Sequence, residues 1–154
     1  MQEKISTENL AIITEQYNIF IEMADRISER RGKANQFYIA ALTGLIAIMS
    51  FIISCSISEE YQLQIIIICS IFGVLLCIVW WINLQSYGKL NAAKFSVIHD
   101  IEEKLPFACY KDEWEYLGNG NDGKKYRQLT KVERFIPIIF SLPFIVAILA
   151  VLIK

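Results

Sequence analysis

Three stretches of the chain are apolar enough, and long enough, to cross a membrane as helices. They cover about residues 37–57, 63–84 and 135–153. The middle stretch contains the run from Ile65 to Ile82, in which no residue is charged. A helix rises about 1.5 Å per residue, so a run of this length spans the hydrocarbon core of a bilayer. The pattern predicts an all-α membrane protein with three transmembrane helices.

The second stretch continues into an amphipathic segment with no residue that would end a helix. After Leu63 the first proline is Pro106. We therefore expect one helix over 63–105, about 64 Å long, whose last part is a cytoplasmic extension of the second span.

The residues before the first span predict an amphipathic cytoplasmic helix over 8–33. Its apolar positions recur three and four residues apart, at Leu10, Ile13, Tyr17, Phe20, Ala24 and Ile27. Such a stripe either packs on a neighbouring helix of its own chain or forms an intersubunit coiled coil. Both interpretations stay open here.

Charge asymmetry predicts how the chain is oriented. Basic residues lie before the first span, at Arg26, Arg30, Arg31 and Lys33, and after the second, at Lys89 and Lys94. In the turn at 58–62 the charged residues are two acids and no base. The positive-inside rule then places the N-terminus in the cytoplasm and the C-terminus outside. The expected parts are a cytoplasmic helix at 1–36, a transmembrane hairpin at 37–84, a cytoplasmic helical segment at 85–134 with a flexible loop at 118–123, and a third transmembrane helix at 135–154.

Aromatic residues mark the expected inner interface. Trp80, Trp81 and Tyr87 lie where the second span leaves the membrane and fit an aromatic belt.

Small residues recur at helical spacing in both members of the hairpin. They are Ala40, Thr43, Gly44, Ala47, Ser50 and Ser54 in the first span, and Ser70, Gly73 and Cys77 in the second. Small residues let helices approach closely in lipid, so Gly44, Ala47 and Gly73 are candidate packing residues of a tight antiparallel hairpin. Alternatively, Thr43, Ser50 and Ser54 line a wet pore between subunits.

Composition and spacing exclude several classes of chemistry. With 15 basic and 16 acidic residues, the chain has no basic field for nucleic acid. The spans hold no ionisable residue of the kind that proton relays need. Gly118 to Lys124 matches GxxxxGK, but Lys125 stands where a P-loop needs a hydroxyl. The single histidine, His99, lacks a converging ligand set. We expect no enzyme activity, no cofactor and no metal site.

The cytoplasmic run resembles a known family. It contains, in order, Trp81–Tyr87, Leu90–Ile98, Glu102–Pro106, Glu113–Trp114 and Tyr126–Glu133. From about Trp80 to Pro137 this set is similar to the RipA family of small bacterial octameric membrane proteins. The resemblance implies a homo-octamer in the lipid bilayer of the bacterial inner membrane, with a cytoplasmic portion and no assigned catalytic residues.

The same run predicts a folded element that carries subunit contacts. Tyr87, Asn91, Lys94, Phe95 and Ile98 fall on neighbouring faces of one helix. Trp114 is the expected anchor of the returning segment.

Eight copies of this element would form a ring, so the leading hypothesis is a structural scaffold. The alternatives are a pore lined by the first transmembrane helix and a membrane effector of a bacterial conflict system. A protein partner on the cytoplasmic side is left open.

Overall fold

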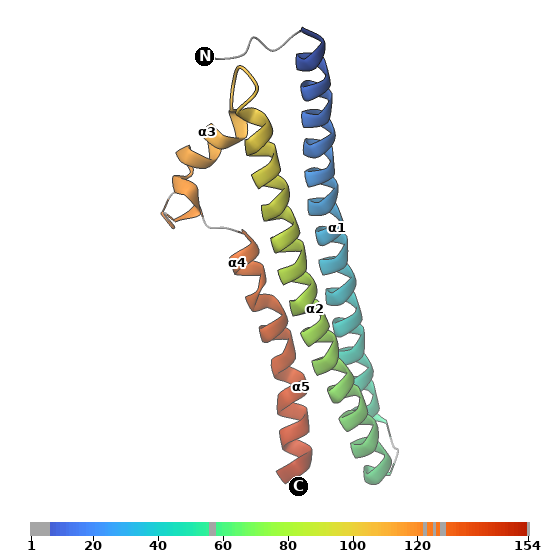
Figure 1. Cartoon of the computed structure of the whole chain (residues 1–154). Helices are drawn as coiled ribbons and strands as arrows, with labels where there is room; N and C mark the ends of the chain where they lie inside the picture. The colour runs from blue at the N-terminus through green and yellow to red at the C-terminus, as the bar shows by residue number, and fades with distance from the viewer. Residues whose placement is uncertain (1–6, 56–57, 122, 125, 127–128, 154) are drawn as a thin grey trace. The chain divides into compact units, whose positions relative to one another are not determined.

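The computed structural model of the chain describes residues 7–55, 58–121, 123–124, 126 and 129–153. These residues form helices and connections and no strand (Figure 1). The elements are α1 (Thr7–Ser54), α2 (Glu59–Glu102), α3 (Cys109–Tyr116), the 3₁₀ helix η1 (Gly118–Gly120), α4 (Leu129–Glu133) and α5 (Phe135–Ile153). The expected all-α fold is confirmed. The predicted boundary at Ile57, the loop residue Asp122 and the terminal Lys154 lie outside the described residues.

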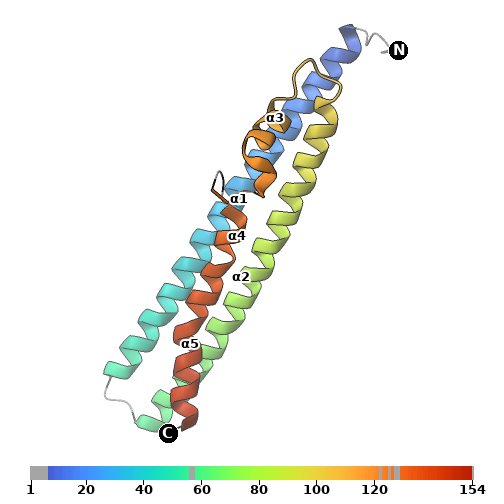
Figure 2. The same cartoon turned by 90° about the vertical axis from the view of Figure 1, so that its left-hand side faces the viewer.

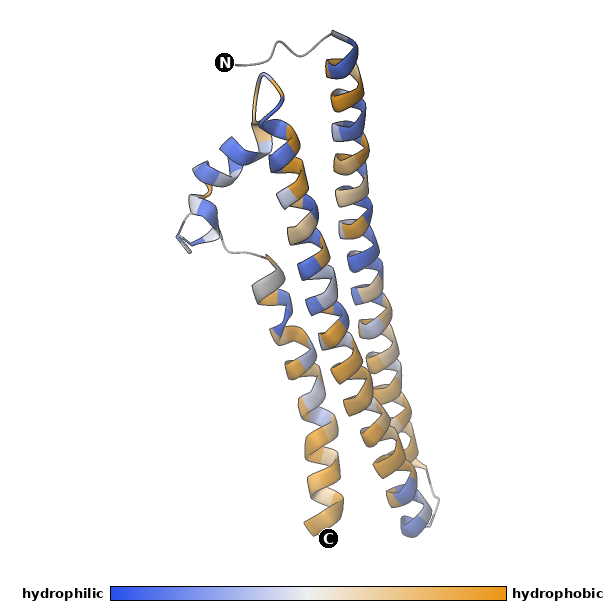
Figure 3. Ribbon diagram, in the orientation of Figure 1, coloured by the Kyte–Doolittle hydropathy of each residue, from blue (hydrophilic) through white to orange (hydrophobic). Residues whose placement is uncertain are grey.

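Three of these helices are long and apolar enough to cross a membrane: α1, α2 and α5. Figure 3 shows that apolar residues cover α5, the C-terminal part of α1 and the N-terminal part of α2. The bounds of α5 agree with the predicted span at 135–153. At most 22% of any of the three apolar windows is buried inside the single chain. Most of this surface is therefore left for lipid or for other subunits.

The N-terminal helix and the first span, expected as separate helices, are one continuous helix of 48 residues. Residues 34–36, where we expected a break, contain no proline, and Asn35 is satisfied by a side-chain hydrogen bond to Trp80. The second span and its extension are likewise one helix, as predicted. It ends at Glu102, three residues before the expected end.

The chain forms two compact units, and α1 and α2 contribute to both. One unit comprises residues 1–30 and 86–129, and the other comprises 31–85 and 130–154. In the second unit α1 and α2 are antiparallel, and α5 runs alongside both (Figures 1 and 2). This unit contains the apolar parts of all three candidate spans.

Candidate assembly surfaces

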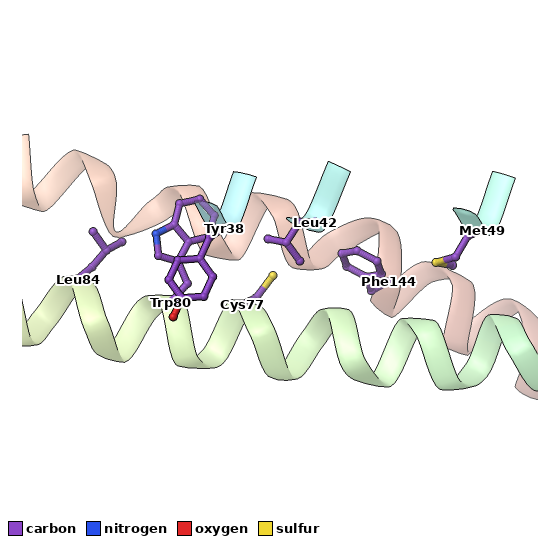
Figure 4. Packing of buried hydrophobic residues seen from close by; sticks show 7 residues of the cluster. All are labelled: Tyr38, Leu42, Met49, Cys77, Trp80, Leu84 and Phe144. Atoms are coloured by element: carbon purple, nitrogen blue, oxygen red, sulfur yellow. The ribbon is translucent and has the colours of Figure 1, made fainter. Parts of the chain in front are cut away.

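The core of the second unit joins α1, α2 and α5. Its buried members, shown in Figure 4, are Tyr38, Leu42, Met49, Cys77, Trp80, Leu84 and Phe144. The rings of Tyr38 and Trp80 are stacked with centroids 5.5 Å apart, and Phe140 of α5 meets Trp80 edge-on at 5.9 Å. Trp80 is 1% exposed, so its expected place in an aromatic belt is wrong. Trp81, by contrast, is exposed.

Two polar pairs lie beside this core. The indole Nε1 of Trp80 donates to Oδ1 of Asn35 at 2.8 Å, and Nδ2 of Asn83 donates to the hydroxyl of Tyr38 at 2.6 Å. A buried polar group costs free energy unless it is paired, so these bonds fix the register between α1 and α2. Both pairs join residues 45 positions apart in the sequence.

An ion pair joins α1 to α4. Nε of Arg31 lies 3.5 Å from Oε2 of Glu133, and each side chain is 14% exposed. Glu133 is four residues before Pro137, which is buried in the first turn of α5. The pair therefore holds the start of α5 against α1.

At Gly73 the helices α2 and α5 approach each other closely. A Cβ atom added at Gly73 would lie 2.6 Å from two ring carbons of Phe144, which is fully buried. Real Cβ atoms do not come this close to a ring. Only glycine allows this packing, which places the predicted packing residue Gly73 against α5.

The hairpin interpretation required the small residues of α1 to face α2, but they do not. Ala40, Thr43, Gly44, Ala47, Ser50 and Ser54 are all exposed in the chain. A Cβ atom at Gly44 would meet nothing within 4 Å. At 100° per residue these positions lie opposite the buried Tyr38, Leu42 and Met49. We call this exposed set the small-residue face of α1.

Two hydroxyls on the small-residue face are already satisfied within the helix. Oγ of Ser50 donates to the carbonyl of Ile46 at 2.9 Å, and Oγ of Ser54 donates to that of Phe51 at 2.8 Å. Such bonds let serine face an apolar neighbour without an unpaired donor. This face can therefore pack closely against another helix.

In the first unit, the apolar stripe of α1 packs on its own chain. Ala24 and Ile27 are buried, and Leu10, Ile13, Tyr17 and Phe20 are half-buried. On the facing helix, Nζ of Lys94 lies 5.2 Å from the ring centroid of Phe20. Of the two interpretations, contact with a neighbouring helix of the same chain describes this stripe.

A buried carboxylate in the first unit joins α1, α2 and α3. Glu102, the last residue of α2, is 1% exposed. It accepts hydrogen bonds from the hydroxyl of Tyr17 at 2.7 Å and from the backbone N–H groups of Tyr110 and Lys111 at 2.8 and 3.0 Å. Ala108, at the N-cap of α3, makes no side-chain capping bond. Glu102 supplies that cap from a distance.

The electrostatics around Glu102 reflect this arrangement. The pKa of Tyr17 is raised above its ordinary value, first by burial and then by its hydrogen bond to Glu102. Burial, followed by the charge of Asp25, raises the pKa of Tyr110 in the same direction. Both hydroxyls thus stay protonated, and Tyr17 remains a hydrogen-bond donor. The sequence analysis did not predict that Glu102 caps α3. Two features of the sequence could have indicated it: an acid lies shortly before Pro106, and the residue before α3, Ala108, has no side chain that could cap that helix.

The residues predicted for subunit contacts pack mostly within their own chain. Ile98 is fully buried, and the ring of Phe95 lies 5.8 Å from Tyr110 and 6.5 Å from His99. Tyr87, Asn91 and Lys94 are half-buried.

Trp114 is half-buried and meets Tyr126 edge-on, with centroids 6.4 Å apart. Its expected role as the anchor of the returning segment stays a prediction. The contacts that join α3 to α2 include the hydrogen bond of Tyr110 to Glu102 and the ring contact of Tyr110 with Phe95.

The glycine-rich run lies in a different setting from a phosphate-binding loop. Gly118 follows α3 rather than a strand, and Gly118, Asn119 and Gly120 all have positive φ. The run is a tight turn in which two positions favour glycine. Over the part of the chain that the structure describes, no three His, Cys, Asp or Glu side chains gather as a metal site would require.

Helix lengths, apolar surfaces and the helical core together define a three-span α-helical membrane protein. The sequence model of the octameric membrane protein family (8xMP) matches residues 14–153, and the chain belongs to this family. This match confirms the resemblance to small octameric membrane proteins of the RipA type. No curated protein and no solved structure matched the chain.

Proposed function

We propose that the protein is a homo-octameric scaffold of the bacterial inner membrane. In this proposal the transmembrane helices hold the subunits in the bilayer, and the cytoplasmic helices form a ring. Membership of the octameric membrane protein family supports assembly with copies of the same chain.

The observation that carries the proposal is the character of the small-residue face of α1. It is exposed in one chain, it lies opposite the core, and the hydroxyls of Ser50 and Ser54 are bonded to their own backbone. In lipid, helix association depends on close packing of small residues rather than on a hydrophobic driving force. A dry contact at Gly44 and Ala47 is therefore the role that this face fits best.

The experiment that tests the octamer is native mass spectrometry of the protein extracted from membranes. The expected species contains eight chains of 17.7 kDa each. Replacing Gly44 by leucine should reduce this species, because the larger side chain would prevent close contact. Ile48→Leu, a conservative change at another exposed position of α1, is the control. A monomer from the unmodified chain would overturn the proposal.

We also propose that the N-terminus is cytoplasmic and the C-terminus external. The exposed thiol of Cys109, in α3, is a natural probe of this orientation. A membrane-impermeant maleimide should label Cys109 only after the membrane is permeabilised. In a Cys109→Ser chain, Glu60→Cys in the first turn of α2 should be labelled in intact spheroplasts. The opposite pattern would reverse the orientation.

A pore is the second candidate function. Thr43, Ser50 and Ser54 share one exposed face of α1, which could surround a central axis. In that case the serine hydroxyls would exchange their backbone bonds for water. Conductance distinguishes this candidate from a scaffold.

A further inference from the structure

In the first unit, α1 has an exposed face that its own chain does not cover. Its members are Glu8, Ile12, Glu15, Ile19 and Glu22, spaced alternately four and three residues apart. All are exposed, and Ile12 and Ile19 are 50% and 48% exposed. We call this set the outer face of α1. Its spacing is that of a helix packed along a second helix.

The end of α2 has a corresponding exposed face. Lys89, Ala93, Ser96 and Asp100 recur at four, three and four residues, and all are exposed. At 100° per residue they lie opposite Ile98, which is fully buried in the chain. We call this set the outer face of α2. Ala93 and Ser96 at its centre leave room for larger side chains.

The two outer faces differ in charge. The outer face of α1 carries three glutamates. The outer face of α2 carries Lys89 and one acid, Asp100. The turn directly after the helix exposes Lys104 and Glu103, and Glu103 is paired with Lys111 of its own chain. An acidic face and a face bordered by lysines are suited to pair with each other rather than each with itself.

The register within one chain shows which residues lie at the same level. The hydroxyl of Tyr17 contacts Glu102, and Met23 lies 3.9 Å from Nζ of Lys94. Because α1 and α2 run in opposite directions, Glu15, two residues before Tyr17, lies level with Lys104, two residues after Glu102.

The same register places other members of the two faces within a few residues of each other. Ile19 lies level with residues 98–100, two to four residues from Ser96, and Glu22 lies level with Ser96. Copies related by rotation about an axis along the helices keep each residue at its own level.

We propose that the outer face of α1 packs against the outer face of α2 of the next subunit. Glu15 pairs with Lys104 of the neighbour, and Ile19 packs on the turn of helix between its Ser96 and Asp100. Because the two surfaces differ, the contact is head-to-tail and can close into a ring. This proposal rests on the octamer proposed above and identifies the contact that orders its subunits.

Disulfide trapping between two separately tagged chains tests the contact. One chain carries Ile19→Cys and the other Ser96→Cys, both in a Cys109→Ser background, and they are expressed together. Oxidation should join the two different tags and leave each variant alone uncross-linked. The matched control replaces Ile19→Cys with Asp25→Cys. Asp25 is as close in level to Ser96, but at 100° per residue it lies about 120° round α1 from Ile19, outside the outer face, so no cross-link is expected.

Native mass spectrometry of the same samples separates failure of this contact from failure of the octamer. An intact octamer without the Ile19–Ser96 cross-link, or with cross-links between two Ile19→Cys chains, would overturn the contact alone. Loss of the octamer from the unmodified chain would overturn the proposed function and the contact with it.

Charge reversal provides a second readout. Glu15→Lys and Lys104→Glu should each lower the octamer fraction, and the chain carrying both should recover it. Equal octamer fractions in all three variants would contradict the pairing.

Discussion

Gly73 offers the sharpest test of how the transmembrane helices pack. Alanine at this position would place its Cβ atom 2.6 Å from two ring carbons of Phe144. Carbon atoms in contact are normally about 3.5–4.0 Å apart, so the ring would have to move by about 1 Å. Phe144 is fully buried in the core between the helices. Overpacking of this kind costs about 1–3 kcal/mol.

A second glycine supplies the reference for this measurement. Like Gly73 in α2, Gly32 lies in the interior of a helix, α1, but a Cβ atom there would meet nothing within 4 Å. Gly32→Ala should therefore show only the gain of about 0.5–1 kcal/mol that alanine gives inside a helix. The stability difference between the two alanine variants isolates the steric cost at Gly73.

The assay is thermal unfolding in detergent, followed by circular dichroism. Gly73→Ala should unfold at a lower temperature than Gly32→Ala. Adding Phe144→Leu, which removes the ring, should recover part of the loss, because the two sites are coupled. Equal unfolding temperatures for the two glycine variants would refute the close approach of α2 and α5.

Three further predictions concern the first unit. Glu102→Ala removes the acceptor of two backbone N–H groups and of the Tyr17 hydroxyl, and should cost about 2–4 kcal/mol; hydrogen exchange in α3 should accelerate, and unchanged exchange would argue against the cap. Because the pKa of Tyr17 is raised in the folded chain, the stability that its protonated hydroxyl contributes is complete below the ordinary tyrosine pKa of about 10 and is lost as pH rises above it. In Tyr17→Phe the free energy of unfolding should fall less steeply with pH above about 10. The same pH dependence in both chains would contradict the hydrogen bond. Trp114→Ala removes the edge-on contact with Tyr126 and, because Trp114 is only half-buried, should cost less than the roughly 3–5 kcal/mol of a fully buried tryptophan; an unfolding temperature equal to that of the unmodified chain would contradict this contact.

The sequence predicted the helices well because their signals are local. An uncharged run identifies α5 without knowledge of any contact, and the absence of proline between Leu63 and Pro106 predicts the continuity of α2. The join between the N-terminal helix and the first span was missed for a related reason. The apolar stripe of the N-terminal helix and the apolar run of the first span were read as two elements, but residues 34–36 between them contain no proline that would end a helix.

The contacts that order the helices could not be predicted, because they connect residues far apart in the sequence. By residue type and position in the sequence, Trp80 fits an aromatic belt. Its place in the core depends on its hydrogen bond to Asn35 and its stacking on Tyr38, both of which lie more than 40 residues away in the sequence. In the sequence Glu102 is only the first residue of the run that leads to Pro106. Its role comes from contacts with Tyr17, 85 residues away, and with the N-terminus of α3.

Of the small residues predicted to pack closely, Gly73 lies in a close contact, but with α5 rather than with α1. A stripe of small residues at helical spacing shows that another helix can approach closely. It does not show which neighbouring helix does so. In this chain Gly73 serves α5, whereas Gly44 is left open within the chain. The difference comes from the position of Phe144, which no local pattern specifies.

Single-channel recording of the purified octamer in a planar bilayer tests the central claim most directly. Native mass spectrometry of the same sample would confirm that eight chains are present. A scaffold with a dry small-residue face on α1 should give a silent bilayer. Discrete currents that disappear in Ser50→Leu would contradict the scaffold and assign a wet conduit to that face.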